Sequence, residues 1–324
     1  MPISTALTGV LGIKHPILSA PMDGIAGARL TAAVSEAGGF GILGGGYGER
    51  DWLEQETAKL KSCATPFGIG FITWSLAKRP ELLEVALAAR PRAVMLSFGD
   101  PRPFAPRIKA AGALLICQVQ AEDMAKQALD AGADVLVAQG TEAGGHGASR
   151  TTLDIVLAIV DLAAGRVPVA AAGGIADGRG LAAMMMLGAS GVLLGTRFYA
   201  SVECDGAEEA KKRICAATSG NSIRSIIFDI SRNNVWPAPF NGRCLVNDHA
   251  RRWMGREVEL MQNVQAVAAE YSAARAAGNF DIAAVIAGDA VGLIHDIPPA
   301  AEIVGRIVTE ADQILRGRRN SATA

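Results

Sequence analysis

One junction recurs four times along the chain: a helical stretch ends in glycine, and a short, apolar, β-rich run begins within a few residues. The four copies read SEAGGFGIL, IKAAGALLI, LDAGADVLV and MLGASGVLL. Glycine suits this place because the residue that follows a helix commonly adopts the left-handed backbone conformation. Apolar runs that alternate with helical stretches predict βα units and a parallel sheet.

Eight runs along the first two-thirds of the chain have the length and composition of buried strands. Stretches of helical period lie between them, such as 28–37 and 121–131. The alternation alone permits a closed barrel or an open sheet, and eight strands with these connections favour a closed (β/α)8 TIM barrel. The expected strands are 16–20, 40–43, 67–72, 93–98, 114–119, 134–138, 167–172 and 191–194.

The alternation of short apolar runs and helical stretches ends after residue 204. Charged helical stretches flank an irregular, aromatic-rich segment that contains WPAPFNG, and the chain then closes with an amphipathic stretch at 299–316. We therefore predict an α/β protein with a barrel at 1–204 and 298–318. A smaller, mainly helical cap, 205–297, is inserted before the last barrel helix.

Composition narrows the class of protein. The 324 residues fit one barrel, which commonly takes about 250 residues, with a modest addition. Net charge is −1, with 31 basic and 32 acidic residues, so no basic face for nucleic acid is expected. Neither a signal peptide nor a membrane span is evident. Five scattered cysteines without metal-ligand spacing predict reduced thiols in a cytoplasmic protein and no metal site. A monomer and a homodimer both remain open.

Two glycine turns close consecutive late strands. One strand ends in Gly173-Gly174, and the next ends in Gly195-Thr196. In barrels of this kind, the loops after strands seven and eight and an adjacent helix N-terminus form the usual phosphate site. Glycine permits close approach of the backbone, whose N–H groups attract the anion. These turns therefore predict a phosphate site, although tight turns alone would also use glycine.

The segment AQGTEAGGHG, 138–147, follows the sixth strand directly. Four glycines beside Gln139 and His146 indicate a loop that faces a ligand. The Gln139 amide carries both donors and an acceptor, which suits a flavin ring edge or a ribityl hydroxyl. His146 is a candidate general base, because a neutral imidazole accepts a proton near physiological pH. The other three histidines are interpreted as structural.

Two weaker signals lie at other strand ends. Ala20-Pro21-Met22 follows the first strand, where a proline turns the chain and leaves backbone groups free. A plain turn explains this segment equally well. Gln118 is a polar residue in the apolar run of the fifth strand, and polar residues at barrel strand ends often serve function.

These segments together resemble the nitronate monooxygenase family, formerly called 2-nitropropane dioxygenases. The resemblance runs nearly end to end through HPILSAPM, AGGFGILGGG, PFGIGF, AQGTEAGGHG, PVAAAGGIADGRG, GTRF and GRCLVNDHARRWMGRE. It implies a TIM barrel with a helical cap, non-covalent FMN, and oxidation of alkyl nitronates by O2 to carbonyl compounds and nitrite. It also implies that His146 deprotonates neutral nitroalkanes where that activity is present.

The resemblance assigns a role to each candidate cofactor residue. Three should lie along the isoalloxazine ring, four should contact the ring and ribityl chain, and four should hold the phosphate. In that order, they are Ala20, Pro21 and Met22; Gln118, Gln139, Gly144 and Gly145; and Gly173, Gly174, Gly195 and Thr196.

Two departures bear on the substrate pocket. Many relatives carry asparagine where this chain has Gly70, and glutamine where it has Leu193. Two alternatives therefore stay open. One is an FMN-dependent NAD(P)H reductase of the same superfamily, acting on enoyl-ACP or quinones. The other, more distant, is a non-catalytic protein that binds a phosphate ligand.

Overall fold

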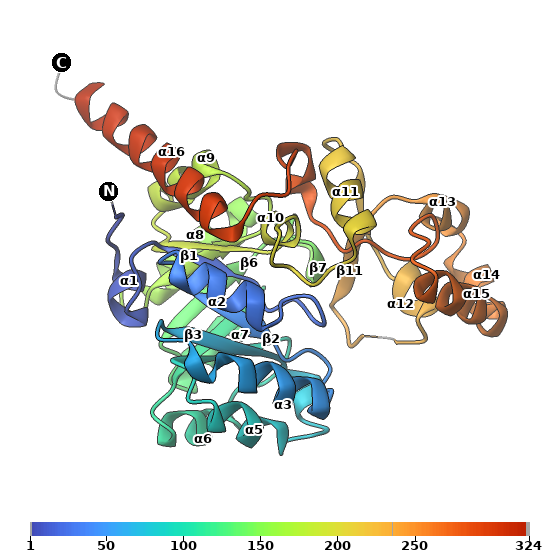
Figure 1. The fold of residues 1–324 in the computed structure, drawn as a ribbon, viewed down its shortest axis with the longest axis horizontal. Coiled ribbons are helices and arrows are strands. Elements are labelled where there is room, and N and C mark those ends of the chain that lie inside the picture. The colour runs from blue at the N-terminus through green and yellow to red at the C-terminus, as the bar shows by residue number, and fades with distance from the viewer. Residues whose placement is uncertain (1, 235, 322–324) are drawn as a thin grey trace.

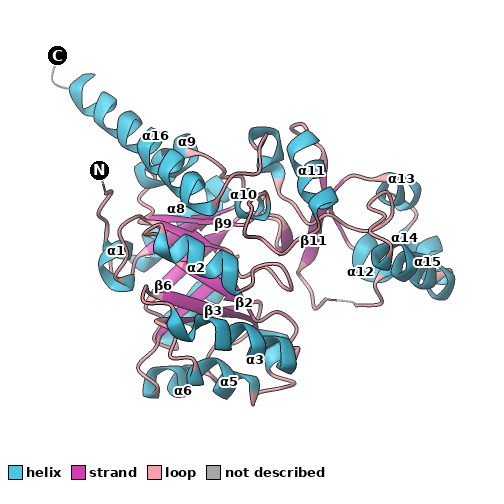
Figure 2. Ribbon diagram, in the orientation of Figure 1, coloured by secondary structure: helices cyan, strands magenta, loops and turns pink. Residues whose placement is uncertain are grey.

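In the computed structural model, which describes the backbone of residues 2–234 and 236–321, eight parallel strands form one sheet (Figures 1 and 2). All eight strands expected from the sequence are present, so the barrel prediction is confirmed. Along the sheet the order is β1 (Ile17–Ser19), β9 (Gly191–Leu194), β8 (Val169–Ala172), β6 (Val135–Gln139), β5 (Leu114–Val119), β4 (Ala93–Ser97), β3 (Phe67–Ile72) and β2 (Gly41–Gly44).

The two edges of this sheet meet and close it into a barrel. A parallel bridge joins Leu18 to Phe40, immediately before β2. The Ser19 N–H donates to the Phe40 carbonyl at 3.0 Å, and the Ser19 hydroxyl accepts from the Ile42 N–H at 3.1 Å. Because every strand is parallel, all eight carboxyl ends open at the same rim.

Side chains alternate between the inside and the outside of the barrel. On β4, Met95 packs into the barrel interior, whereas Val94 and Leu96 pack outward against the helices. Helix α1 (Ala6–Leu11) adds Leu7 and Leu11 to the interior cluster. The barrel interior is thus a packed core, and a ligand site is expected at the rim.

Helices surround the sheet, as Figure 2 shows. The glycines at the four recurrent junctions, Gly38, Gly112, Gly132 and Gly188, have φ between 76° and 94°, as their position after a helix predicts. The surrounding helices are α2 (Ala28–Glu36), α3 (Arg50–Lys59), η1 (Leu60–Ser62), α4 (Thr73–Leu76), α5 (Leu82–Ala88), α6 (Ala105–Ala110), α7 (Glu122–Asp130), α8 (Thr152–Ala163), α9 (Gly178–Met186) and α10 (Thr196–Tyr199).

The chain then leaves the barrel and builds a lobe beside it, to the right in Figure 1. Helices dominate this cap: α11 (Glu208–Ala216), α12 (Ile227–Ser231), α13 (Asp248–Trp253), α14 (Glu257–Gln262), α15 (Val264–Ala276) and η2 (Asp289–Leu293). Helix α16 (Ala300–Ser321) then packs back against the barrel helices α2 and α9. Among the described residues, no helix has the length and apolar character needed to cross a membrane.

The cap also contributes two strands that the sequence did not reveal. Strands β10 (Ser222–Ser225) and β11 (Asn241–Leu245) pair antiparallel, and β11 pairs in turn with β7 (Gly145–Gly147). Part of the expected glycine loop is therefore a strand, in which His146 lies opposite Gly242. The segment expected to be irregular contains β11 and the end of α12. This three-stranded sheet joins barrel and cap.

Candidate active site

A cavity of about 580 Å³ opens at the carboxyl ends of the barrel strands. Its size is in the range of small-molecule and cofactor sites. Nine of the eleven candidate cofactor residues line it: Ala20, Met22, Gln118, Gln139, Gly144, Gly173, Gly174, Gly195 and Thr196. Residues from five strand ends thus meet at one place, although they are spread over most of the barrel sequence.

Gly173 and Gly174 form a concave backbone turn in the cavity wall. Their φ angles are 113° and 70°, which L side chains rarely adopt, and a Cβ on Gly173 would lie 2.6 Å from the Thr152 hydroxyl. The backbone N–H groups of both glycines donate to no acceptor in the part of the chain that the structure describes. Successive free N–H groups in such a turn form an anion-binding concavity.

Thr196 stands at the opposite side of this turn, as the first residue of α10. Its hydroxyl accepts from the Gly288 N–H at 3.0 Å, which leaves the O–H free to donate. The neighbouring α9 offers its N-terminus less freely, because the Asp177 and Glu310 carboxylates accept its first N–H groups. The anion cradle therefore consists of the two glycine turns and the start of α10.

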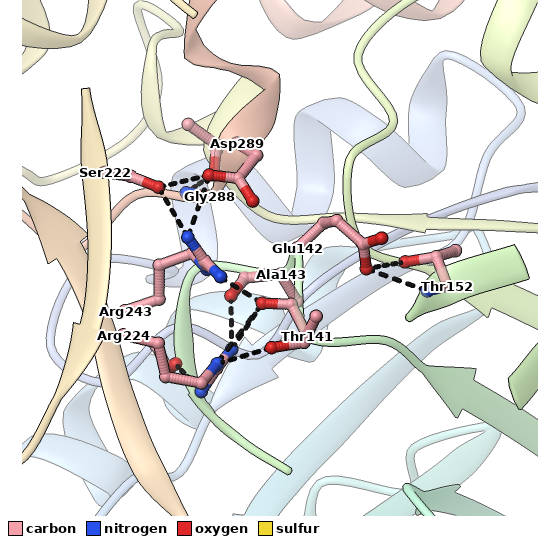
Figure 3. A network of polar contacts seen from close by, with 11 residues as sticks. Thr141, Glu142, Ala143, Thr152, Ser222, Arg224, Arg243, Gly288 and Asp289 are labelled. Carbon is pink, nitrogen blue, oxygen red and sulfur yellow. Dashed lines mark hydrogen bonds and ion pairs between the residues drawn. The ribbon is translucent and has the colours of Figure 1, made fainter. Parts of the chain in front are cut away.

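Glu142 is the one charged residue in the described cavity lining. Figure 3 shows its carboxylate turned toward Thr152, which donates its backbone N–H at 2.8 Å and its hydroxyl at 2.7 Å. Thr152 opens α8, so the helix dipole also stabilises this carboxylate. Because no lysine or arginine lines the described cavity, an anion there depends on backbone N–H groups and hydroxyls.

Three glutamine amides form a network beside the cavity. Gln118 and Gln120 both donate to Oε1 of Gln139, at 3.1 and 2.7 Å. The Gln139 amide nitrogen donates in turn to the His146 carbonyl at 3.1 Å. The network fixes the orientation of Gln139 and ties the fifth and sixth barrel strands to the strand that carries His146.

Arg224 of β10 holds the 141–147 segment from the cap side (Figure 3). Its guanidinium donates to the carbonyls of Thr141 and Ala143 at 2.9 Å, and to those of Gly145 and Gly147 at 3.3 Å. No carboxylate pairs with it among the described residues. Burial, together with the neighbouring Arg243 charge, lowers the pKa of Arg224 to about 10. The half-buried guanidinium is thus hydrogen-bonded by backbone carbonyls of the segment that it holds.

Arg243 of β11 completes this clamp. It donates to the Thr141 carbonyl at 2.8 Å and forms an ion pair with Asp289 at 2.9 Å. Ser222 bridges the pair, because its hydroxyl contacts the Asp289 carboxylate and accepts from Arg243 (Figure 3). The position of the glycine segment is therefore set largely by cap residues.

His146 is buried and makes a close pair with a carboxylate from the cap. Its Nε2 lies 3.0 and 3.1 Å from the two carboxylate oxygens of Asp229 on α12. Only 7% of the His146 side chain and 4% of the Asp229 side chain are exposed. Arg232 donates to the same carboxylate at 2.5 Å. A carboxylate that accepts Nε2–H leaves Nδ1 as the basic nitrogen of a neutral imidazole.

Opposing effects set the charge of this histidine. Burial lowers the pKa of His146 below its ordinary value of 6.5, and the hydrogen bond and negative charge of Asp229 act in the opposite direction. The positive charges of Arg232 and Arg224 add to the lowering. The imidazole is therefore neutral at pH 7 and available to accept a proton.

An aromatic cluster covers His146. The Trp236 ring stacks on the imidazole with centroids 3.5 Å apart and planes 5° apart, and Trp236 Nε1 donates to the Tyr47 hydroxyl at 2.8 Å. Trp74 of α4 and Phe98, which directly follows β4, meet Trp236 edge to face. Phe98 has φ of 64°, a strained conformation for a non-glycine residue and one that clusters at functional sites.

The two remaining candidate cofactor residues do not line the cavity. Pro21 packs against Gly70, where an added Cβ would lie 2.4 Å from the proline Cβ. An asparagine at position 70 would therefore need the 20–22 turn to move. Gly145 lies in β7 and gives its carbonyl to Arg224. Leu193 lines the cavity and forms an apolar wall.

Sequence reasoning missed the residues that the cap supplies. Asp229, Arg224 and Arg243 lie 83, 78 and 97 residues after His146 in the chain, outside any short motif. Trp236 belongs to the aromatic-rich WPAPFNG segment, and it contacts both His146 and barrel aromatics. The one local feature that could have indicated β11 is the alternation of polar and apolar residues in the run NGRCL.

The comparisons with known proteins agree with this arrangement. A family model described as nitronate monooxygenase matches residues 4–80 and 73–310. The chain belongs to the nitronate monooxygenase family.

Three relatives illustrate the range of this family's neighbours. The nitronate monooxygenase of Neurospora crassa is 32% identical over 94% of this chain and 91% of its own length. An enzyme of Mycobacterium tuberculosis named (3aS,4S,5R,7aS)-5-hydroxy-7a-methyl-1-oxo-octahydro-1H-indene-4-carboxyl-CoA dehydrogenase is 28% identical over 96% and 97%. The structure of FabK from Thermotoga maritima superposes with a TM-score of 0.86 and 31% identity, over 98% and 99%. Together they identify this family member as an oxidoreductase.

The Trp236 ring should protect His146 from chemical modification. Trp236→Ala removes the stacked ring, so we expect acylation of His146 by diethyl pyrocarbonate to become severalfold faster, as measured by mass spectrometry of the 138–150 peptide. Trp74→Ala is the matched control, since Trp74 contacts Trp236 and Tyr47 edge to face. Equal rates in wild type and Trp236→Ala would show that the ring does not control access.

Proposed function

We propose that this protein binds FMN and oxidises alkyl nitronates with O2 to carbonyl compounds and nitrite. It also accepts neutral nitroalkanes, after His146 has removed the α-proton. The observation that carries the proposal is the buried, neutral His146, paired with Asp229 and located in the strand that continues from the cavity-lining Gly144. A protein that merely binds a phosphate ligand would have no use for such a base.

The residues at the cavity fit the phosphate end of FMN. Gly173 and Gly174 have free N–H groups in a turn that a Cβ would crowd, and Thr196 adds a hydroxyl. No dinucleotide fingerprint follows the first strand, which favours a single terminal phosphate over the pyrophosphate of FAD. Ala20, Met22, Gln118 and Gln139 would lie along the ring and ribityl chain. When bound, FMN supplies the redox chemistry that takes the substrate to products with O2.

The protein's own groups position the substrate and move a proton. A nitronate already carries a negative charge and needs no base. A neutral nitroalkane must first lose its α-proton to Nδ1 of His146, while the C–H electron pair forms the C=N bond of the nitronate. Asp229 stabilises the imidazolium that results. The aromatic cluster over His146 excludes water from this step.

A second candidate function follows from two of the relatives. The similarity to a CoA-ester dehydrogenase and to FabK favours an FMN-dependent reductase or dehydrogenase that acts on an acyl thioester. Leu193 and Gly70 also depart from the pattern of many nitronate monooxygenases. In that reaction a reduced nicotinamide or the substrate itself would deliver electrons to the flavin.

We also propose that residues 205–297 form the substrate cap on a barrel built from 1–204 and 298–318. A cytoplasmic location is consistent with five cysteines that are all free thiols.

Anaerobic stopped-flow spectroscopy distinguishes the two functions. We expect the bound flavin to be reduced by primary alkyl nitronates and to remain oxidised with NADH or NADPH. The flavin-loaded protein is mixed in parallel with 1-nitropropane nitronate, neutral 1-nitropropane, 3-nitropropionate, NADH and NADPH. The two nicotinamides are tested with and without an enoyl thioester. Rapid reduction by a nicotinamide with no response to any nitro compound would favour the reductase.

The glycine turn gives a test of the cofactor. Gly174→Val places a side chain in the cradle, so we expect the protein to fold and to lose most of its FMN, measured as the ratio of flavin to protein absorbance. Gly165→Val is the control, because Gly165 has a similar φ of 73° and open space around it. Stoichiometric FMN in Gly174→Val, or release of FAD from the wild type, would contradict the proposed site.

The His146→Asn variant should affect the turnover of neutral nitroalkanes and of nitronates differently. Loss of the base should reduce kcat/KM for a neutral nitroalkane by about 10² to 10⁴, whereas nitronate turnover and FMN content change little. In the wild type, nitroalkane turnover should rise as pH increases through a pKa below 6.5 and level off before neutrality, because burial favours the neutral imidazole. Equal loss of both activities with FMN retained would assign His146 a positional role instead.

A further inference from the structure

The cap carboxylate Asp229 contacts the histidine on which the proposed reaction depends. We infer that Asp229 is a positioning residue, which holds the Nε2–H tautomer of His146, directs Nδ1 toward the substrate and stabilises the imidazolium formed by proton transfer. This inference rests on the proposed function for its catalytic consequence, but the tautomer that it assigns can be measured without any substrate.

The geometry assigns the direction of the hydrogen bond. His146 Nε2 faces both Asp229 oxygens, at 3.0 and 3.1 Å, and a carboxylate can only accept from it. Nδ1 makes no hydrogen bond with any residue that the structure describes. The two ring nitrogens thus have different roles: Nε2 holds a proton, and Nδ1 is the acceptor.

The surroundings make this contact strong. Both side chains are more than nine-tenths buried, where a charge-assisted hydrogen bond is stronger than in water. The Arg232 guanidinium, whose side chain is 16% exposed, forms an ion pair with Asp229 at 2.5 Å and holds the carboxylate beside the ring. On its other face, His146 meets Trp236, with Tyr47 bonded behind that ring, so the imidazole has little freedom to rotate.

The charged groups that face His146 come from two cap elements. Asp229 and Arg232 belong to or adjoin α12, and Arg224 belongs to β10. The negative charge favours the imidazolium, and both positive charges oppose it. Removing Asp229 and removing Arg232 should therefore shift the titration of His146 in opposite directions.

The proton transfer balances within the site. The α-C–H bond of the nitroalkane breaks, its electron pair forms the C=N bond of the nitronate, and the proton forms the Nδ1–H bond. No oxidation occurs in this step. With Asn in place of Asp229, the side-chain amide can donate to Nε2, which leaves the proton on Nδ1 and removes the base; an Asp-to-Asn change in a Ser-His-Asp triad imposes the wrong tautomer in this way.

The first test uses the purified, flavin-loaded protein labelled with ¹⁵N-histidine. Only four histidines are present, so His146→Gln assigns the signals of His146. We expect the neutral wild-type ring to carry its proton on Nε2. We expect Asp229→Asn to move it to Nδ1, with FMN content unchanged. A wild-type ring protonated on Nδ1 would overturn the inference, whatever the substrate proves to be.

The second test is the pH profile of kcat/KM for a neutral nitroalkane. Asp229→Asn should lower the plateau by about 10² to 10⁴ and leave nitronate turnover within a few fold. Arg232→Gln should retain the plateau within about tenfold and shift the acidic limb to higher pH. Asp248→Asn is the matched control, since that carboxylate pairs with Arg251 on the cap surface.

Each outcome has a defined meaning. If Asp229→Asn and Arg232→Gln shift the acidic limb in the same direction, or if Asp229→Asn depresses nitronate and nitroalkane turnover equally, Asp229 serves the fold and the inference is wrong. If Asp229→Asn fails to fold, the wild-type tautomer and the Arg232→Gln profile decide. If the wild type oxidises no nitro compound, the proposed function fails, and the tautomer still decides the role of Asp229.

Discussion

The pairing of β7 with β11 is the contact on which the active site depends. A barrel closes its own sheet and needs no cap, but its rim leaves the glycine segment after β6 without a partner. The cap strand gives that segment a backbone ladder, with His146 opposite Gly242. The same pairing places α12 beside the imidazole, so one short sheet brings together the histidine from the barrel and the carboxylate from the cap.

Arg224 explains how the glycine-rich segment 140–147 is held in one conformation. Glycine loses more conformational freedom on folding than any other residue, and this segment holds four within eight positions. The half-buried guanidinium compensates with several hydrogen bonds to carbonyls, among them those of Thr141 and Ala143. Since the cation has no carboxylate partner among the described residues, its solvation depends on the folded segment. The arrangement makes cap docking and loop order mutually dependent.

The sequence predicted the barrel well because its signals are local. A glycine after a helix and an apolar run beyond it report on neighbouring residues, and all eight strands were found where these signals put them. The cavity was also predictable from local signals, because parallel strands that end in Gly173, Gly195 and Gln118 place these residues at one rim. Pro21 was assigned to the ring by resemblance; it packs on Gly70, and its contact with the ring stays a prediction.

The cap contacts were not predictable, because they join distant parts of the chain. Gly145–Gly147 has no strand propensity of its own and becomes a strand only through β11, almost a hundred residues later. Asp229 lies in a run of apolar residues, SIIFDIS, where a single carboxylate carries no motif. Its burial is explained only by two partners in the folded protein, His146 and Arg232, which hydrogen-bond to the carboxylate.

His146 and its carboxylate partner Asp229 therefore come from separately built parts of the molecule. Without the docked cap, His146 would sit in a glycine segment with free rotation, solvated and without Asp229 to select its tautomer. Docking buries the ring under Trp236, which lowers its affinity for a proton, and supplies a carboxylate, which raises it. The two effects oppose each other, so the imidazole is neutral while the carboxylate beside it still favours its charged form. A buried histidine without the carboxylate would be a poor base, and an exposed one with it would be partly protonated at the start.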